Sequence, residues 1–195
     1  MTTKTMPAAK RLSAQLIPVS VPTSAGCFTA HFSSAGLAGL DFPAANTPCY
    51  DCPPHLRAWR TQTAAALERA LKGQPPGAGP PLDLGRGTDF QRSVWHVLRT
   101  IPPGRTWSYG EVAAAAGRPA AWRATGNACG ANPVPVLVPC HRVLASRGRL
   151  GGFSAGLHWK RRLLAAEGAW PREGVAELRP ADGQARERAG KPGKL

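Results

Sequence analysis

The chain has 195 residues, of which 43% are hydrophobic, and it carries a formal net charge of +14. A chain of this length can bury one sizeable core or two small ones, and no apolar run reaches the length of a membrane-spanning helix. Behind the basic residues Lys4, Lys10 and Arg11, Gln15 and Pro18 interrupt the apolar run that a signal peptide needs. Five cysteines, an odd number spread along the chain, do not suggest a disulfide framework. We therefore expect a cytoplasmic protein.

The positive charge is concentrated in one half of the chain. Residues 85–170 hold twelve basic and three acidic side chains, whereas residues 15–84 hold four of each. A basic half of this kind predicts a polyanionic partner such as nucleic acid. The alternative is a set of solvated arginine-rich faces without a partner. Charge alone does not choose between DNA, RNA and a membrane surface.

The first half of the chain predicts a small antiparallel β-meander followed by one helix. Apolar residues first alternate with polar ones and are broken by two short turn-forming segments. They then recur at helical spacing between two segments rich in proline. We expect strands within 15–42 with turns at 23–26 and 33–36, a loop over 43–54, a helix over 55–72 and a linker over 73–81.

The second half predicts a series of helices. Thr88 is placed to cap a helix whose apolar stripe lies within 90–98. Ser108 and Glu111 have the spacing of a capping box, which begins a second helix. A third helix over 120–129 follows a tight turn, so the second and third form a candidate helix-turn-helix. The last helix is expected over 157–167, with Trp159, Leu163 and Leu164 facing inward and Lys160, Arg161 and Arg162 facing outward.

These elements divide the chain into four expected parts. The end segments have little apolar material and are expected to be disordered. The parts are a basic lead over 1–14, an α/β domain over 15–81, a mainly helical domain over 82–170 and a tail over 171–195.

An apolar stretch containing prolines leads to a cysteine, a histidine and an arginine. The run 134–138 is short and rich in β-branched residues, which favours a buried strand over a helix. Pro135 and Pro139 cannot donate to a sheet ladder, so the strand is expected at a sheet edge. The thiol of Cys140 is therefore expected at a rigid strand end.

Cys140 is a candidate nucleophile. A thiolate is strongly nucleophilic, and neighbouring cations such as His141 and Arg142 lower the pKa of a thiol. Adjacent side chains of an extended chain point to opposite faces, so contact between Cys140 and His141 requires a turn or a bridging water. The alternative is that Cys140 is a small buried apolar residue, which is common for a free cysteine.

The second half of the chain, taken whole, resembles the O6-alkylguanine-DNA alkyltransferases, a family of suicidal DNA repair proteins. The resemblance runs through about residues 85–168 and is most specific at Pro139-Cys140-His141-Arg142-Val143. Residues 15–84 match more loosely. The other matching segments are Gly87–Gln91 with Val94–Trp95, Ile101–Gly104, Ser108–Ala113, Arg123–Ala124, Asn132–Pro133, Leu150–Phe153, Lys160, Leu163–Leu164 and Glu167.

The resemblance implies an α/β fold with two domains. The N-terminal domain would be small and ribonuclease-H-like. The C-terminal domain would be mainly helical, with a helix-turn-helix (winged-helix-like) element that binds DNA.

The resemblance also implies a role for each matching residue. The catalytic set would be Cys140 as alkyl acceptor, His141 as a base acting through a water, Glu167 as the residue that holds His141, and Tyr109 as donor to the leaving guanine. Around the base, Asn132 would brace the cysteine segment, the backbone at Cys140 and Val143 would read the guanine edge, Phe153 would stack and Ser154 would contact O6. On the DNA, Arg123 would fill the gap left by a flipped base, and Tyr109, Gly110, Arg118 and Ser146 would fall at contact positions.

The chemistry so implied is direct-reversal DNA repair. A protein sulfur cannot approach a stacked base in line, so the nucleotide must be rotated out of the duplex. An alkyl group on O6 of guanine, or on O4 of thymine, is a soft carbon electrophile that suits a thiolate. Nothing in the sequence supplies a second nucleophile to cleave the thioether, so we expect one turnover per molecule. We expect a monomer acting on double-stranded DNA, with no metal, organic cofactor or membrane partner.

Two other functions remain open at this point. One is a sensor that binds alkylated DNA without transfer, although relatives of that kind lack the cysteine. The other is a cysteine hydrolase, which would need an oxyanion site and repeated turnover.

Three features depart from the family pattern. Phe153 stands where many relatives carry tyrosine, so a hydroxyl contact would be lost while stacking is kept. Ala155 replaces a glycine, which would narrow the pocket against bulky alkyl groups. The Cys49-x-x-Cys52 pair, with Cys27, His31 and His55, resembles a zinc set only loosely, and we expect no structural metal there.

Overall fold

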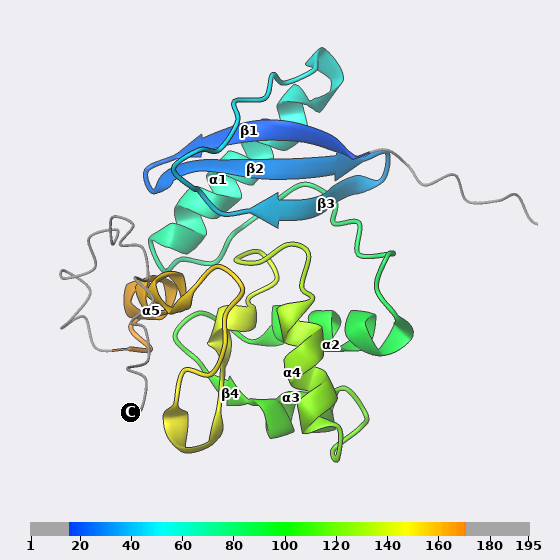
Figure 1. Cartoon of the computed structure of the whole chain (residues 1–195), viewed down its shortest axis with the longest axis vertical. Coiled ribbons are helices and arrows are strands. Elements are labelled where there is room, and N and C mark those ends of the chain that lie inside the picture. The colour runs from blue at the N-terminus through cyan, green and yellow to red at the C-terminus, as the bar shows by residue number, and fades with distance from the viewer. Residues whose placement is uncertain (1–15, 171–195) are drawn as a thin grey trace, which may run out of the picture.

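A computed structural model describes residues 16–170 of the chain. The basic lead expected over 1–14 and the tail expected over 171–195 lie outside the described residues. A three-stranded sheet with a helix against one face forms one part, and the helices of the second half lie beyond one edge of that sheet (Figure 1). Across residues 16–170, no helix combines the length and the apolar character that crossing a bilayer requires.

The predicted β-meander is confirmed. The strands β1 (Ile17–Thr23), β2 (Gly26–Ser33) and β3 (Gly36–Asp41) pair antiparallel in the order β1-β2-β3. Each connection has two residues between the paired ends, as the turn signals predict. Gly36 is required at its position because its φ is +144° and a Cβ there would lie 2.1 Å from the Pro81 carbonyl oxygen.

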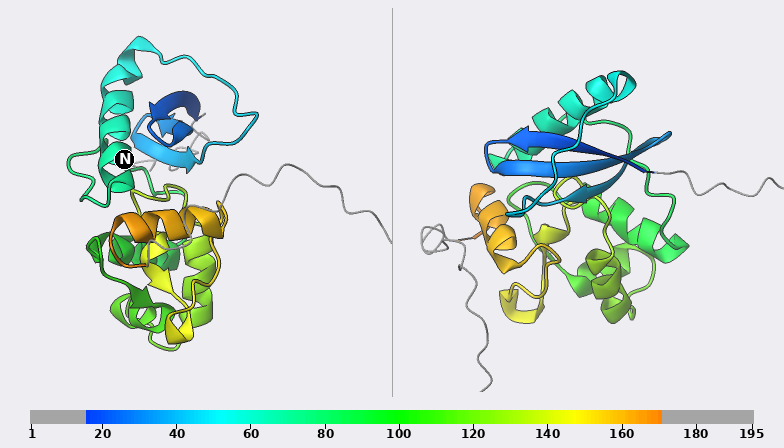
Figure 2. Two further views of the ribbon diagram at one scale, coloured as in Figure 1. Left: turned by 90° about the vertical axis from the view of Figure 1, so that its left-hand side faces the viewer. Right: turned by 45° about the horizontal axis from the view of Figure 1, so that its top comes forward.

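One helix covers the sheet, as predicted for residues 55–72. A short 3-10 turn, η1 (Pro54–Leu56), leads into α1 (Arg57–Leu71), which lies against one face of the strands (Figure 2). Leu67 and Ala70 of α1 are buried together with Val19, Val21 and Phe28 of the strands. Burial of about 25 cal/mol per Å² of apolar surface is what holds such a two-layer unit together.

The four helices predicted for the second half are present, and the first two begin where their capping signals place them. These are α2 (Asp89–Thr100), α3 (Tyr109–Ala115), α4 (Trp122–Gly130) and α5 (Leu157–Ala166). Thr88 and Ser108 are the N-caps of α2 and α3, and both form complete capping boxes, with Gln91 and Glu111. α3 and α4 are joined by a short turn and contact each other, but their assignment as a helix-turn-helix stays a prediction.

The strand predicted over 134–138 is wrong. The segment is a tight turn, in which the Val138 amide donates to the Val134 carbonyl at 2.9 Å. Val136 has φ +73°, a left-handed conformation that is costly for a β-branched residue and that no local propensity predicts. Pro139 then forms an inverse γ-turn, with the Cys140 amide donating to the Val138 carbonyl at 2.8 Å. Cys140 therefore begins a 3-10 turn, η2 (Cys140–Arg142), instead of ending a strand.

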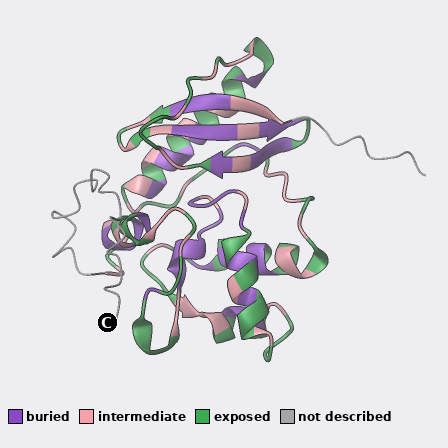
Figure 3. Cartoon of the chain, in the orientation of Figure 1, coloured by how far each residue is buried: buried purple, intermediate pink, exposed green. Residues whose placement is uncertain are grey.

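Short backbone links join the sheet to the helical part along the outer edge of β3. The Leu37 amide donates to the Pro81 carbonyl and the Leu40 amide to the Pro133 carbonyl, both at 2.8 Å. Phe42, just after β3, packs against Trp159 and Phe153 with ring centroids 4.8 and 5.8 Å apart. The buried residues on both sides form one continuous core (Figure 3). The segment before Cys140 is thus held against the sheet.

Candidate active site around Cys140

The Cys140 side chain lies in the wall of a cavity of about 350 Å³. The residue is only 5% exposed, as the buried-cysteine alternative supposes, but its cavity separates it from an ordinary core cysteine. The lining residues come from the start of α3, the second half of α4, η2 and the glycine-rich loop. They are Tyr109, Gly126, Cys129, Gly130, Cys140, Gly152, Phe153 and Ser154.

Asn132 ties the thiol to the turn that precedes it. Its side-chain amide donates to the Cys140 sulfur at 3.2 Å and to the Val138 carbonyl at 2.7 Å. Its side-chain oxygen accepts from the Val134 amide at 3.1 Å. The expectation that Asn132 braces the cysteine segment therefore has a direct structural counterpart.

His141 and Glu167 form a buried pair behind the thiol. The Nε2 atom of His141 lies 2.9 Å from Oε1 of Glu167, and both side chains are no more than 2% exposed. Arg142 donates to the same carboxylate and to the Ile101 carbonyl. Burial raises the pKa of Glu167, but the hydrogen bonds from His141 and Arg142 and the charge of Arg142 outweigh it and lower that pKa to about 2. Glu167 is thus ionised and can only accept, so Nε2 of His141 carries a hydrogen.

This pairing leaves the other ring nitrogen of His141 available. Burial lowers the pKa of His141, although the Glu167 carboxylate opposes the effect, so the resting imidazole is neutral. Within residues 16–170, Nδ1 is buried and has no hydrogen-bond partner. A neutral ring that donates through Nε2 has its lone pair on Nδ1, so this atom can accept a proton.

Lys160 is a correction to the expected outward face of the last helix. Its side chain is fully buried and donates to the carbonyls of Val143 at 2.7 Å, Leu150, and Gly152 at 3.4 Å. Burial lowers the pKa of Lys160 to about 8. Helical spacing alone had assigned this cation to the surface with Arg161 and Arg162. In the structure it ties the strand after Cys140 to the glycine-rich loop.

The thiol is protonated at rest. Burial raises the pKa of Cys140, and the Asn132 hydrogen bond and the Lys160 charge lower it only in part. The cation expected beside the thiol was Arg142, but that guanidinium is committed to Glu167. A neutral thiol in this position needs a base before it can attack.

Tyr109 faces the thiol across the cavity. A two-stranded parallel sheet of β4 (Trp107–Ser108) and β5 (Val143–Leu144) joins the residue before Tyr109 to the segment after Cys140. Gly151, at φ +67°, allows close approach of the loop, since a Cβ there would lie 3.1 Å from the Tyr109 hydroxyl oxygen. Burial, reinforced by Cys129 and Cys140, raises the pKa of Tyr109. The phenol is therefore a proton donor at neutral pH.

Comparison with known proteins begins with the helical half. A family model described as "6-O-methylguanine DNA methyltransferase, DNA binding domain" matches residues 89–169. The methylated-DNA–protein-cysteine methyltransferase of Mycolicibacterium paratuberculosis is 55% identical over 86 residues, 44% of this chain and 52% of that protein. The Salmonella typhimurium protein of the same name is 52% identical over 82 residues, 42% of this chain and 48% of that protein. The chain spans about half the length of these curated relatives.

A solved structure extends the match over both halves. The crystal structure of Mycobacterium tuberculosis OGT in complex with DNA is 35% identical, has a TM-score of 0.64, and is matched over 81% of this chain and 96% of that chain. The chain belongs to the O6-methylguanine-DNA methyltransferase family. The Mycobacterium tuberculosis O6-methylguanine methyltransferase structure, at 33% identity and a TM-score of 0.64, is matched over 83% of this chain and 98% of that chain. The predicted family and the mixed helix and strand fold with a DNA-binding domain are confirmed.

The residues that this methyltransferase-family member was expected to use fall into two groups. Cys140, Tyr109, Phe153 and Ser154 line the cavity, and Asn132, His141, Glu167 and the buried Val143 lie behind it. The expected DNA contacts are exposed and lie outside it: Gly110 on α3, Arg118 after α3, Arg123 on α4 and Ser146 in η3 (Ser146–Gly148).

The sequence did not predict three residues of α4 that line this cavity, Gly126, Cys129 and Gly130. Cys129 and Gly126 of α4 line the same cavity as Cys140. Burial, with a smaller contribution from Cys140, raises the pKa of the Cys129 thiol to about 12. Their i, i+3 spacing on α4 was a usable signal, because it places both on one helix face.

Ala155 lies beside the Cys140 cavity instead of in it. It lines an adjoining hollow of about 390 Å³ with Pro135 and Ser154, and Ser154 also borders the Cys140 cavity. The loosely zinc-like set is not assembled: among residues 16–170, no three His, Cys, Asp or Glu side chains lie together in a way that could hold a metal ion.

Proposed function

We propose that this protein is a direct-reversal DNA repair methyltransferase that moves a methyl or small alkyl group from O6 of guanine in DNA to Cys140. O4 of thymine is a further candidate donor. The observation that carries the proposal is the placement of the Cys140 sulfur, which faces a cavity, accepts a hydrogen bond from Asn132 and has the His141–Glu167 pair behind it. Family membership supports the same assignment.

The first step is deprotonation of the thiol. The proton passes through a water to Nδ1 of neutral His141, while the hydrogen on Nε2 stays bonded to nitrogen and is donated to the ionised Glu167. The Asn132 amide and the Lys160 ammonium stabilise the resulting thiolate. Water cannot solvate a thiolate in this buried site, so these two groups are needed to stabilise its negative charge.

The second step forms the carbon–sulfur bond. The thiolate attacks the alkyl carbon, the bond from that carbon to O6 breaks, and the electron pair leaves with guanine. Tyr109 donates a proton to the departing base, which lowers the barrier. The products are a thioether and unmodified guanine. A thioether is stable, so each molecule reacts once, without a cofactor.

The cavity admits a base only after the nucleotide has left the duplex. Phe153 stacks on the base, Ser154 contacts O6 and the backbone at Cys140 and Val143 reads the guanine edge. Arg123 fills the vacated position, which offsets part of the unstacking cost of a few kcal/mol. Gly110, Arg118 and Ser146, all exposed around the cavity-bearing helices, contact the DNA backbone together with Tyr109.

The architecture follows the same proposal. Residues 15–81 form a ribonuclease-H-like domain, and residues 82–170 form the alkyl-acceptor domain, in which α3 and α4 act as a helix-turn-helix. The protein works as a monomer on double-stranded DNA in the cytoplasm. The exposed arginines of the second half supply the phosphate contacts on which DNA affinity depends.

One experiment separates this function from the two alternatives. The protein is incubated in excess with a duplex carrying O6-[³H-methyl]guanine, and the label on protein is counted against active chains. Transfer predicts about one label per chain and none on a Cys140→Ala variant. DNA binding without label supports a sensor, and product far in excess of protein supports a hydrolase; either result would overturn the proposal.

A further inference from the structure

We infer that Trp122 is a DNA-contacting residue, whose indole packs against the extruded nucleotide at the mouth of the Cys140 cavity. The inference rests on the proposed function and deepens it. Trp122 is the first residue of α4 and is 50% exposed, and the other exposed large apolar residue among those described, Leu157, is 39% exposed. A single exposed apolar side chain is ordinary on a protein surface, so exposure alone does not indicate a DNA contact. The position of Trp122 relative to the cavity does.

The position of Trp122 on α4 aligns it with the cavity. Residues Trp122, Gly126, Cys129 and Gly130 are spaced i, i+4, i+7 and i+8, which places them on one face of the helix. The last three line the Cys140 cavity. At a rise of 1.5 Å per residue, Trp122 lies about 6 Å along the axis from Gly126. The indole is therefore one helical turn beyond the cavity lining on the same face of α4, and the inference makes this exposed side the entrance.

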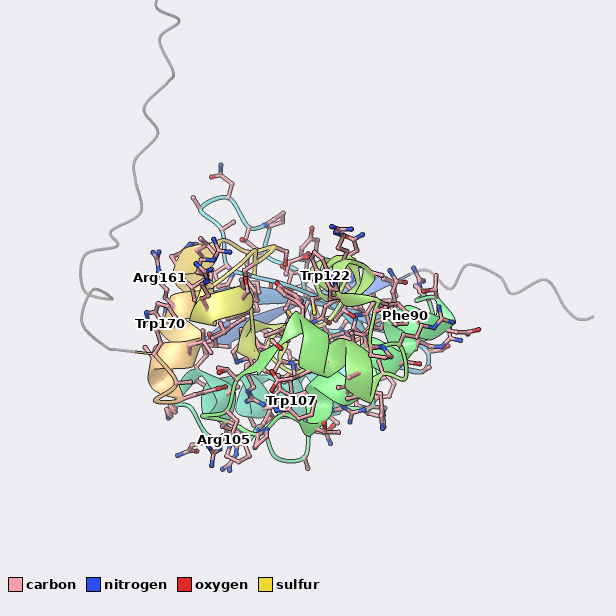
Figure 4. All side chains as sticks on the ribbon, turned by 90° about the horizontal axis from the view of Figure 1, so that it is seen from below. Phe90, Arg105, Trp107, Trp122, Arg161 and Trp170 are labelled. Carbon is pink, nitrogen blue, oxygen red and sulfur yellow. The ribbon has the colours of Figure 1, made fainter. Side chains whose placement is uncertain are left out.

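The residue next to Trp122 is Arg123, which is proposed to fill the gap left by the flipped base. The guanidinium carbon of Arg123 lies 4.5 Å from the indole ring centroid, a cation–π contact. Within residues 16–170, Arg123 has no hydrogen bond or ion pair to another side chain. Seen from below, Trp122 is labelled at α4 in the upper part of the view, with Phe90 to its right (Figure 4). The pair therefore presents an aromatic surface and a free cation side by side.

The charge around Trp122 fits a nucleic acid. Between residues 101 and 156 the basic side chains are Arg105, Arg118, Arg123, Arg142, Arg147 and Arg149, and the one carboxylate is Glu111. That carboxylate is tied to Ser108 in the α3 capping box, and Arg142 is buried. Arg118 makes a second cation–π contact, 5.3 Å from the Phe90 ring centroid. An exposed aromatic, Trp122, beside arginines and a half-buried one, Phe90, under a guanidinium form the kind of surface that binds nucleotide bases and backbone.

The geometry of α4 gives Trp122 and Arg123 different contacts with the DNA. Adjacent residues on a helix differ by about 100° in direction, so Trp122 and Arg123 cannot fill the same space. Trp122 follows the cavity face, along which the flipped nucleotide must pass. Arg123 leaves the helix about 100° from that face, with its guanidinium against the edge of the cavity face at the Trp122 ring, and its cation is the group that fills the gap in the duplex. Trp122 therefore stabilises the extruded nucleotide and Arg123 stabilises the duplex behind it.

The test compares a duplex substrate with a substrate that needs no duplex. Transfer rates are measured for a duplex containing O6-methylguanine and for free O6-benzylguanine, using the full chain and its Trp122→Ala, Trp122→Phe and Leu157→Ala variants. Trp122→Ala is expected to slow the duplex reaction about tenfold, the size of one lost aromatic–base stack, and to leave the free-base reaction within about twofold. Trp122→Phe should retain most of the parent rate on the duplex, and Leu157→Ala should react at the parent rate with both substrates.

Three outcomes would overturn the inference. Equal losses on duplex and free base would mean that Trp122 only supports the fold of the cavity. Loss of the Trp122→Ala effect in an Arg123→Ala background would mean that the indole acts only through Arg123. Equilibrium affinity for the same duplex, measured by fluorescence anisotropy in a Cys140→Ala background, is independent of the chemistry. If the parent protein transfers no alkyl group but Trp122→Ala still binds the duplex more weakly, only the proposed function is rejected. If transfer occurs and Trp122→Ala changes neither the duplex affinity nor the duplex rate, only this inference is rejected.

Discussion

The side-chain amide of Asn132 donates to the sulfur of Cys140 at 3.2 Å while also donating to the Val138 carbonyl. One residue thus fixes both the reactive atom and the turn that delivers it. The turn contains Val136 in a left-handed conformation, a cost of about 1–3 kcal/mol that its surroundings must offset. Asn132 supplies part of that offset through three buried hydrogen bonds.

Replacing Asn132 by leucine should damage stability and reactivity together. The change leaves the Val134 amide without a partner and the Val138 carbonyl with the Cys140 amide alone, so we expect the free energy of unfolding to fall by about 1–3 kcal/mol. The pKa of the Cys140 thiol should also rise, because a donor to the thiolate is lost. Urea denaturation and the rate–pH profile with O6-benzylguanine measure the two effects. Asn127→Leu, on the exposed side of α4, is the matched control; an unshifted profile in Asn132→Leu would contradict the assignment.

Tyr109→Phe should slow transfer without weakening the fold. Within residues 16–170 the Tyr109 hydroxyl makes no hydrogen bond, so its removal should change the free energy of unfolding by no more than about 0.5 kcal/mol. Loss of a general acid should lower the single-turnover rate on the methylated duplex on the order of a hundredfold. Rapid-quench kinetics at matched DNA saturation give the rate. A variant as fast as the parent would remove Tyr109 from the chemical step.

Glu167 should make stability depend on acid pH. Its folded pKa of about 2 lies below the ordinary value of 4.5, so its stabilising contribution is fully present above about pH 4.5 and is lost as pH falls through 2. A shift of that size corresponds to about 3 kcal/mol. The difference in unfolding free energy between the parent and Glu167→Gln should therefore be largest above pH 5 and shrink toward pH 2. Denaturation across this range tests it, with Asp51→Asn as the exposed control; a pH-independent difference would count against the pair.

Lys160→Met should loosen the glycine-rich loop and raise the pKa of the thiol. The buried ammonium holds the Val143, Leu150 and Gly152 carbonyls and lowers the pKa of Cys140 through its charge. We expect an unfolding free energy lower by about 2–4 kcal/mol and a rate–pH profile displaced to higher pH. Arg161→Met, the next residue of α5, should change neither. If the displaced profile appeared in Arg161→Met as well, nonspecific loss of charge would explain it.

Much of the fold was predictable from the sequence because turns and helix starts are determined by residues close together in the chain. Turn residues bounded the β-meander, and the capping boxes at Thr88 and Ser108 fixed where α2 and α3 begin. The turn over 134–138 did not follow, because apolar β-branched residues favour strands and the φ of Val136 is imposed by tertiary contacts. Its strand prediction failed for that reason.

The site was predictable only in part. Residue identities around Cys140 came from resemblance, and the structure brings Asn132, His141, Glu167 and Tyr109 to it. The direction of Lys160 did not follow from helical spacing, because three carbonyls compensate the burial of its charge. The sequence pattern does not predict that these three carbonyls meet at one ammonium group, because they belong to two separate segments of the chain.

The central claim is that the alkyl group ends on the Cys140 sulfur. Cys129 lines the same cavity, and one tryptic peptide, residues 124–142, carries both cysteines. The direct measurement is therefore fragmentation mass spectrometry of that peptide after reaction with a methylated duplex. We expect one added methylene mass on the fragments containing Cys140, none on those ending at Cys129, and no addition in Cys140→Ala. A methyl group on Cys129, or an unmodified peptide after the lesion has been repaired, would contradict it.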